Sequence, residues 1–258
     1  MMSQKYLEKN IMKNILNSNI PVVILAGGRG SRILEYTRAM PKPLIRINRK
    51  PIIIRIIDHY ISFGFKNFII ATGYLNNVIE DFFSKNYKRK KNEYLYSNDC
   101  KIKLVFTGLD TMTGGRVLRL KSILNKKSQN FCLTYGDGVS NVDLNKLINF
   151  HNLHKKIATV TTVRPPARFG YMKIKNDQVL KFGEKKNVDA GWINGGFFIF
   201  NNKIFKFIKN DSTFLEREPL ENLAFKRELK AYKHFGFWQC MDTLRDKVFL
   251  DEHYKKNK

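Results

Sequence analysis

From Pro21 to Val163, apolar runs that suit buried strands alternate with segments of helical periodicity. The run VVILA at 22–26 is continuous and ends at Gly27, which is typical of a parallel strand covered on both faces. This alternation predicts βαβ units, and therefore an α/β, Rossmann-like fold with a mostly parallel central sheet and helices on both faces. We expect strands at 22–26, 66–72, 103–108, 130–138 and 157–163, and helices at 50–63, 76–83, 115–124 and 141–154.

After Pro165 the simple alternation ends. The stretch YMKIKNDQVLKF, residues 171–182, predicts a hairpin that turns at Asn176-Asp177, because these residue types favour tight turns between β-rich runs. The later expected elements are strands at 191–200 and 229–235 and helices at 202–209, 217–227 and 244–255.

The chain contains no linker rich in Pro, Gly or Ser, so we expect one domain at 21–258. Its first part, about 21–164, carries the βαβ pattern, and the part from about 165 to 258 is an appended, β-rich region. An amphipathic arm at 1–20 precedes the domain, with apolar residues at helical spacing.

Composition excludes several classes of protein. The 43% hydrophobic and 13% aromatic content indicates a folded globule. No run approaches the roughly 18 apolar residues that span a bilayer, and the first residues lack the apolar core of a secretory signal. The three cysteines form no CxxC pair. We therefore expect a cytoplasmic protein that is not bound to a membrane.

The formal net charge is +25, and a basic surface attracts acidic partners such as nucleic acid, anionic lipid or phosphorylated small molecules. A compositional bias toward Lys on solvated faces explains the charge equally simply. The only dense basic cluster, at 88–91, lacks the interleaved aromatic residues of a single-strand binder. Nucleic acid is therefore not the expected partner.

A glycine-rich loop, Gly27–Gly30, follows the first strand directly. Ligands of open α/β sheets bind at the carboxyl ends of the strands, and glycines let backbone N–H groups approach a polyphosphate closely. Arg32 and Lys42 can then neutralise phosphate charge, and Pro41 and Pro43 restrict the backbone around Lys42.

This loop differs from two better-known phosphate-binding loops. A P-loop requires Gly-Lys-Ser/Thr, whereas Gly30 is followed by Ser31-Arg32. The dinucleotide fingerprint requires a third glycine where this chain has Ile33. The glycines alone could equally form an ordinary tight turn, and the added cations favour phosphate binding.

Six blocks of sequence together resemble the sugar-phosphate nucleotidyltransferases, which make nucleoside diphosphate sugars, and in particular those that transfer a cytidylyl group to glucose 1-phosphate. The resemblance covers about residues 21–256. The blocks are LAGGRGSR with PKPLI, TGLDTMTGGR (107–116), FCLTYGDGV, RPPARFG (164–170), WINGGFFIFN (192–201) and FWQCMDTLRDK (237–247).

The resemblance implies a Mg²⁺ ion held by Asp137 and Asp242, which suits the preference of this cation for oxygen ligands. Taken alone, Asp137 in Gly-Asp-Gly could be a turn residue and Asp242 a helix N-cap. Asp246, one turn further on, is expected on the helix surface or in an ion pair with Arg245 or Lys247.

The resemblance also implies two binding regions and four catalytic residues. Thr111 and Arg116 match nucleotide-binding positions, although Arg116 could instead be a solvated residue in the first turn of a helix. The implied nucleotide-binding residues are Leu25, Ala26, Gly27, Gly28, Arg29, Gly30, Ser31, Arg32, Lys42, Thr111, Arg116 and Gly136. The implied sugar-phosphate-binding residues are Tyr171, Glu184, Lys185, Asn194 and Gly195. The catalytic residues are Arg32, Lys42, Asp137 and Lys185.

The implied activity is transfer of CMP from CTP to α-D-glucose 1-phosphate, by a homo-oligomer, giving CDP-glucose and pyrophosphate. The alternatives are a relative that uses UTP, dTTP, GTP or another sugar 1-phosphate, and a non-catalytic binder of nucleotide or nucleic acid. One departure bears on the sugar, because Glu184-Lys185-Lys186 stands where the family usually has Glu-Lys-Pro.

Overall fold

A computed structural model describes residues 17–30, 37, 39–97, 99–165, 170–175, 177–184 and 191–256. The predicted amphipathic arm lies outside these residues except at its last few positions, and Ser31, Arg32 and Lys185 also lie outside them. No helix among the described residues is long and apolar enough to cross a membrane.

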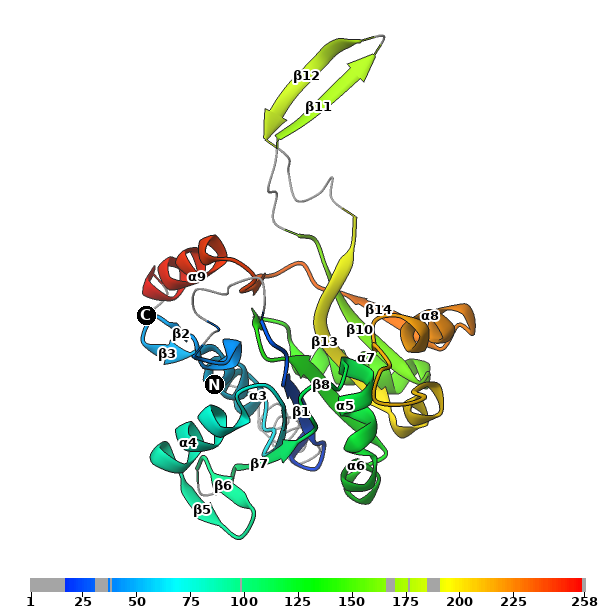
Figure 1. Cartoon of the computed structure of the whole chain (residues 1–258). Helices are drawn as coiled ribbons and strands as arrows, with labels where there is room; N and C mark the ends of the chain where they lie inside the picture. Colours follow the sequence, from blue (N-terminus) through cyan, green and yellow to red (C-terminus); the bar gives the residue numbers. More distant parts are fainter. Residues whose placement is uncertain are drawn as a thin grey trace, which may run out of the picture.

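The described residues form one large mixed sheet (Figure 1). The central strands β8, β1, β4 and β7 run parallel, and β13 pairs antiparallel with both β8 and β10. The predicted α/β class with a mostly parallel core is therefore confirmed. In spatial order the strands are β14 (Leu229–Lys233), β10 (Ala158–Val163), β13 (Ile193–Asn201), β8 (Asn130–Tyr135), β1 (Val22–Ala26), β4 (Asn67–Thr72), β7 (Lys101–Phe106), β6 (Glu93–Leu95) and β5 (Lys88–Lys90).

Helices cover both faces of this sheet, as predicted. Alternate residues of β1 point to opposite faces, so Val22 and Ile24 join one buried cluster and Val23 and Leu25 join the other. The first cluster contains residues of α3 (Ile52–Ile61), α4 (Asn76–Asn86), α7 (Leu144–His154) and α9 (Leu244–Lys256). The second contains residues of α5 (Thr113–Arg119), α6 (Lys121–Lys127) and α8 (Glu218–Phe225).

Three helix predictions need correction. The helix expected from residue 50 begins at Ile52, because Lys50–Pro51 form β3, which pairs with β2 (Arg46–Ile47). The helix expected at 115–124 is two short helices, α5 and α6, that meet at Leu120. The helix expected at 202–209 is the 3₁₀-helix η4 (Asn202–Phe207).

The basic cluster at 88–91 forms part of a short hairpin at the edge of the sheet. Strand β5 is fully exposed and pairs antiparallel with β6. Lys91, at φ 55°, lies in the turn. Charged side chains on an edge strand oppose pairing with another chain, which gives this cluster a structural role.

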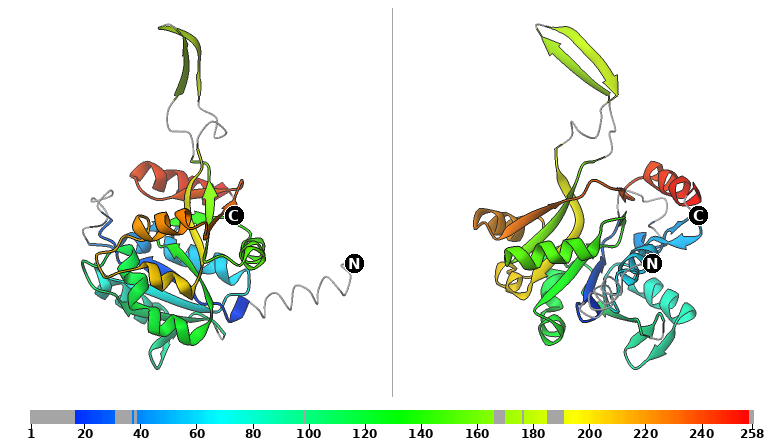
Figure 2. Two further views of the ribbon diagram at one scale, coloured as in Figure 1. Left: turned by 90° about the vertical axis from the view of Figure 1, so that its right-hand side faces the viewer. Right: turned by 180° about the vertical axis from the view of Figure 1, so that it is seen from behind.

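A second hairpin lies apart from the large sheet. Strands β11 (Gly170–Lys175) and β12 (Gln178–Glu184) pair with each other, and Asp177 in the turn has φ 62°. The predicted turn at Asn176-Asp177 thus agrees with Asp177. Figures 1 and 2 show this hairpin extending well beyond the rest of the fold.

Candidate active site

The pairing of β9 with β15 brings Asp137 and Asp242 together. Strand β8 ends at Tyr135, and the chain turns through Asp137 into the short strand β9 (Gly138–Ser140). Strand β15 (Trp238–Cys240) pairs antiparallel with β9, so the residues that follow β15 lie beside the residues that precede β9. The backbone N–H of Met241 donates to the carbonyl of Asp137 at 2.9 Å, which joins the two turns.

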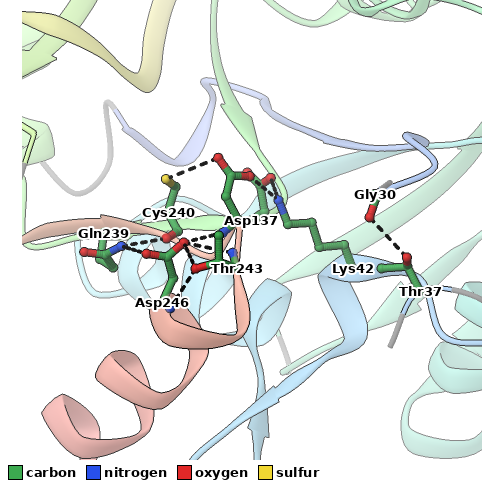
Figure 3. A network of polar contacts seen from close by, with 9 residues as sticks. Gly30, Thr37, Lys42, Asp137, Gln239, Cys240, Thr243 and Asp246 are labelled. Atoms are coloured by element: carbon green, nitrogen blue, oxygen red, sulfur yellow. Dashed lines mark hydrogen bonds and ion pairs between the residues drawn. The ribbon is translucent and has the colours of Figure 1, made fainter. Parts of the chain in front are cut away.

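The ammonium of Lys42 lies between the two carboxylates. Its Nζ atom is 2.6 Å from Oδ2 of Asp137 and 2.6 Å from Oδ1 of Asp242 (Figure 3). Lys42 begins the short 3₁₀-helix η2 (Lys42–Leu44) and is 9% exposed. Burial alone would lower the pKa of Lys42, but the two carboxylates, Asp137 most strongly, raise it above its ordinary value.

The same two carboxylates suit a divalent cation. One oxygen of each carboxylate contacts the same ammonium group, so the two carboxylates are close enough to bind one cation together. Mg²⁺ usually takes one or two protein carboxylates and completes its shell with phosphates and water. Asp137 and Asp242 supply that set, and the structure places both in one cavity. Their role as metal ligands stays a prediction.

Asp246 holds the turn that carries Asp242. Asp246 is 7% exposed, and its carboxylate accepts hydrogen bonds from the backbone N–H of Asp242 at 3.0 Å and of Thr243 at 2.8 Å. It also accepts from the Thr243 hydroxyl and from the Gln239 amide (Figure 3). The backbone N–H of Asp246 donates to the Thr243 hydroxyl, which completes a capping box for α9. The expectation of a helix-surface residue is therefore wrong.

Arg116 lies beneath the glycine loop and not in solvent. It is 4% exposed, and its guanidinium donates to carbonyls that include those of Gly27 at 2.9 Å and Gly108 at 2.8 Å. Burial lowers the pKa of Arg116 from its ordinary value. A Cβ atom at Gly27 would lie 2.3 Å from its Nη1 atom, so any other residue there would displace the guanidinium. The solvated alternative for Arg116 is wrong.

One cavity of about 770 Å³ unites the nucleotide and sugar sides of the predicted site. Arg29 does not line it but pairs with the exposed Asp110 at 2.8 Å. Tyr171 and Glu184 lie in β11 and β12, and their side chains are outside the part of the chain that the structure describes. The predicted residues that line the cavity are Leu25, Ala26, Gly27, Gly28, Gly30, Lys42, Thr111, Arg116, Gly136, Asp137, Asn194, Gly195 and Asp242.

Comparisons with known proteins show the family of this chain. The family model described as Nucleotidyl transferase matches residues 21–237. The chain belongs to the nucleotidyl transferase family. It is 42% identical over 248 residues to the glucose-1-phosphate cytidylyltransferase of Salmonella typhimurium, covering 92% of this chain and 96% of the relative. It is 36% identical to a probable glucose-1-phosphate cytidylyltransferase of Bacillus subtilis, covering 91% and 96%.

Solved structures support the fold of this nucleotidyl transferase. A UDP-glucose pyrophosphorylase complexed with UDP-glucose superposes with a TM-score of 0.70 at 17% identity, covering 93% of this chain and 99% of the other. HddC from Yersinia pseudotuberculosis superposes with a TM-score of 0.69 at 23% identity, covering 91% and 99%.

The sequence analysis did not identify Glu216, a carboxylate that lines the cavity of this nucleotidyl transferase. The carboxylate of Glu216 accepts from the Tyr135 hydroxyl at 2.5 Å and from the Thr113 hydroxyl at 2.6 Å. Tyr135 could have been found from its place at the end of β8, just before Gly-Asp-Gly. Glu216 carries no such signal, because it lies in a loop far along the chain from both partners.

Trp238 also lines the cavity, and its indole N–H donates to the carbonyl of Gly195 at 2.7 Å. This bond ties β15, which leads to Asp242, to the start of β13, where Asn194 lies. The indole therefore lines the cavity and also positions the backbone at Gly195.

Proposed function

We propose that this protein transfers CMP from CTP to α-D-glucose 1-phosphate, forming CDP-glucose and pyrophosphate. The observation that carries the proposal is the cluster of Asp137, Asp242 and Lys42 in the lining of the cavity. The choice of base and sugar is supported by the 42% identity to a glucose-1-phosphate cytidylyltransferase over nearly the whole of both chains.

The reaction joins two anions, so positioning and charge neutralisation carry most of the catalysis. An oxygen of the sugar phosphate attacks the α-phosphorus of CTP as the bond to the β-phosphate breaks, and pyrophosphate leaves with the electron pair. Asp137 and Asp242 would hold Mg²⁺, which supplies positive charge to both phosphates. Lys42 and Arg32 neutralise the leaving pyrophosphate, and Lys185 orients the attacking phosphate.

The glycine loop and Arg116 form the predicted nucleotide-binding side of the cavity. Gly28 has no neighbour within 4 Å of the place of a Cβ atom, which leaves open space for a phosphate above its backbone. Arg116 holds Gly27 from below through its carbonyl, so the loop keeps its shape before the nucleotide arrives. We expect the protein to work in the cytoplasm, and the family resemblance implies a homo-oligomer.

A test of this proposal measures pyrophosphate release with glucose 1-phosphate and each of CTP, UTP, dTTP and GTP. CTP should give the highest kcat/KM. Asp137→Asn and Asp242→Asn should abolish turnover while leaving the melting temperature near that of the wild type. Asp81→Asn, an exposed carboxylate on α4, is the matched control and should remain active. Full activity in both site variants, or preference for another triphosphate, would refute the proposal.

A further inference from the structure

Glu216 is a carboxylate inside a cavity that must accept two polyanions. It lines the same cavity as Lys42 and the two aspartates, and its side chain is exposed to that space. Among the described residues, no cation contacts Glu216, in contrast to Asp137 and Asp242. A phosphate placed next to it would be repelled, so the carboxylate must face a part of the substrates that donates hydrogen bonds.

The protein holds this carboxylate in a fixed position. Oε1 accepts from the Tyr135 hydroxyl and Oε2 accepts from the Thr113 hydroxyl, so each oxygen is fixed by one donor. The Thr113 hydroxyl also accepts from the backbone N–H of Leu215 at 2.9 Å, which fixes the loop before Glu216. Burial and the nearby carboxylate raise the pKa of Tyr135, so its hydroxyl stays protonated and donates.

A carboxylate has about four lone-pair sites, and these two hydroxyls use two of them. Glu216 lines the cavity between two predicted binding regions, so a substrate can reach the remaining sites. Thr113 begins α5, two residues after Thr111 on the nucleotide side. Tyr135 accepts a hydrogen bond at 3.5 Å from Asn194 on the sugar side. Glu216 therefore lies between the predicted nucleotide side and the predicted sugar side of the cavity.

We propose that Glu216, held by Tyr135 and Thr113, determines specificity by accepting hydrogen bonds from the hydroxyl groups of a bound substrate. This inference rests on the proposed function, because it assigns one more contact in the same cavity. A site built to accept a hydrogen bond from a hydroxyl disfavours an analogue that lacks the hydroxyl, because that hydrogen bond to the carboxylate is then lost.

The test compares wild type, Glu216→Gln and Glu218→Gln with substrates that each lack one hydroxyl. Glu218 is the matched control because it is near in sequence but pairs with Lys209 at 2.6 Å and does not line the cavity. One arm uses 2′-deoxy-CTP and 3′-deoxy-CTP, and the other uses the deoxyglucose 1-phosphates. The readout is the ratio of kcat/KM for the parent substrate to kcat/KM for each analogue.

We expect wild type and Glu218→Gln to favour the parent over one analogue by roughly tenfold to a hundredfold, and Glu216→Gln to lose most of that preference. The arm in which the preference collapses identifies the ribose or the hexose as the source of the hydroxyl. Tyr135→Phe should give a kcat/KM ratio between those of wild type and Glu216→Gln. Its fraction of folded protein, measured by circular dichroism, should equal that of wild type.

Two results would overturn this inference. One is a Glu216→Gln variant whose preference is unchanged for every analogue in both arms. The other is a variant whose discrimination changes only between CTP and UTP, since Glu216 would then read the base. A wild-type protein without turnover of CTP and glucose 1-phosphate refutes the proposed function instead, and the wild-type assay separates that failure from failure of the role of Glu216.

Discussion

Removal of the Asp246 carboxylate tests how the turn that carries Asp242 is held. Asp246→Ala deletes four hydrogen bonds to one buried carboxylate, from Gln239, Asp242 and twice from Thr243. A hydrogen bond to a charged group contributes about 1.5–3 kcal/mol, but bonds to one carboxylate are not additive, and water can reach part of the space. We expect a loss of about 3 kcal/mol in the free energy of unfolding, or roughly 10 °C in Tm.

The assays are urea unfolding and Mn²⁺ binding in the absence of nucleotide. Glu252→Ala, an exposed carboxylate on the same helix, should change stability by less than about 0.5 kcal/mol. Asp246→Ala should also weaken Mn²⁺ binding, because Asp242 loses the hydrogen bond that orients its backbone. If Asp246→Ala unfolds at the same urea concentration as Glu252→Ala, the turn is held by other contacts and this reasoning is wrong.

Three further perturbations test the site and the core. Lys42→Met should bind Mn²⁺ about tenfold more tightly without nucleotide, by electron paramagnetic resonance, because the ammonium no longer occupies the two carboxylates; equal affinity would show that Lys42 does not compete with a cation. Gly27→Ala should lower Tm by several degrees because its methyl group would meet the Arg116 guanidinium, whereas Gly28→Ala, which meets nothing within 4 Å, should melt like wild type; equal melting of the two variants contradicts this. Burial lowers the pKa of His151 to about 4 from 6.5, so the unfolded chain takes up a proton that the folded chain does not. Stability should thus be full above pH 6.5 and fall by up to about 3 kcal/mol toward pH 4, and His151→Asn should show a smaller fall in urea titrations at both pH values.

The sequence predicted the central strands β1, β4 and β8 because each has a strong apolar pattern. It predicted the structure less well where tertiary contacts decide it. No periodicity distinguishes one helix of residues 115–124 from two that meet at Leu120. Strands β9 and β15 have three residues each, too few for a pattern, yet their ladder brings Asp137 and Asp242 together. The prediction that Asp137 and Asp242 lie together came from the family resemblance and not from periodicity.

The wrong expectation that Asp246 lies on the helix surface could have been avoided from the sequence. Thr243 and Asp246 have the spacing of a capping box, with a hydroxyl residue followed three positions later by a carboxylate at a helix start. The burial of Asp246 has a different origin. It depends on Gln239 from β15 contacting the same carboxylate, and only the packing of α9 against that strand supplies this contact.

The direction of β13 explains why residues from both halves of the chain share one cavity. Strands β1, β4, β7 and β8 are parallel, so their carboxyl ends meet at one edge and supply the glycine loop and the turn at Asp137. A further parallel strand would bring only its own carboxyl end to this edge. Because β13 runs antiparallel to β8, with Phe197 opposite Thr134, its amino end with Asn194 and Gly195 lies beside Tyr135 instead. The hairpin formed by β11 and β12 precedes β13 in the chain, and β13 begins at this edge of the sheet. The antiparallel direction of β13 thus places residues of the appended region beside the end of β8, in the same cavity as the glycine loop.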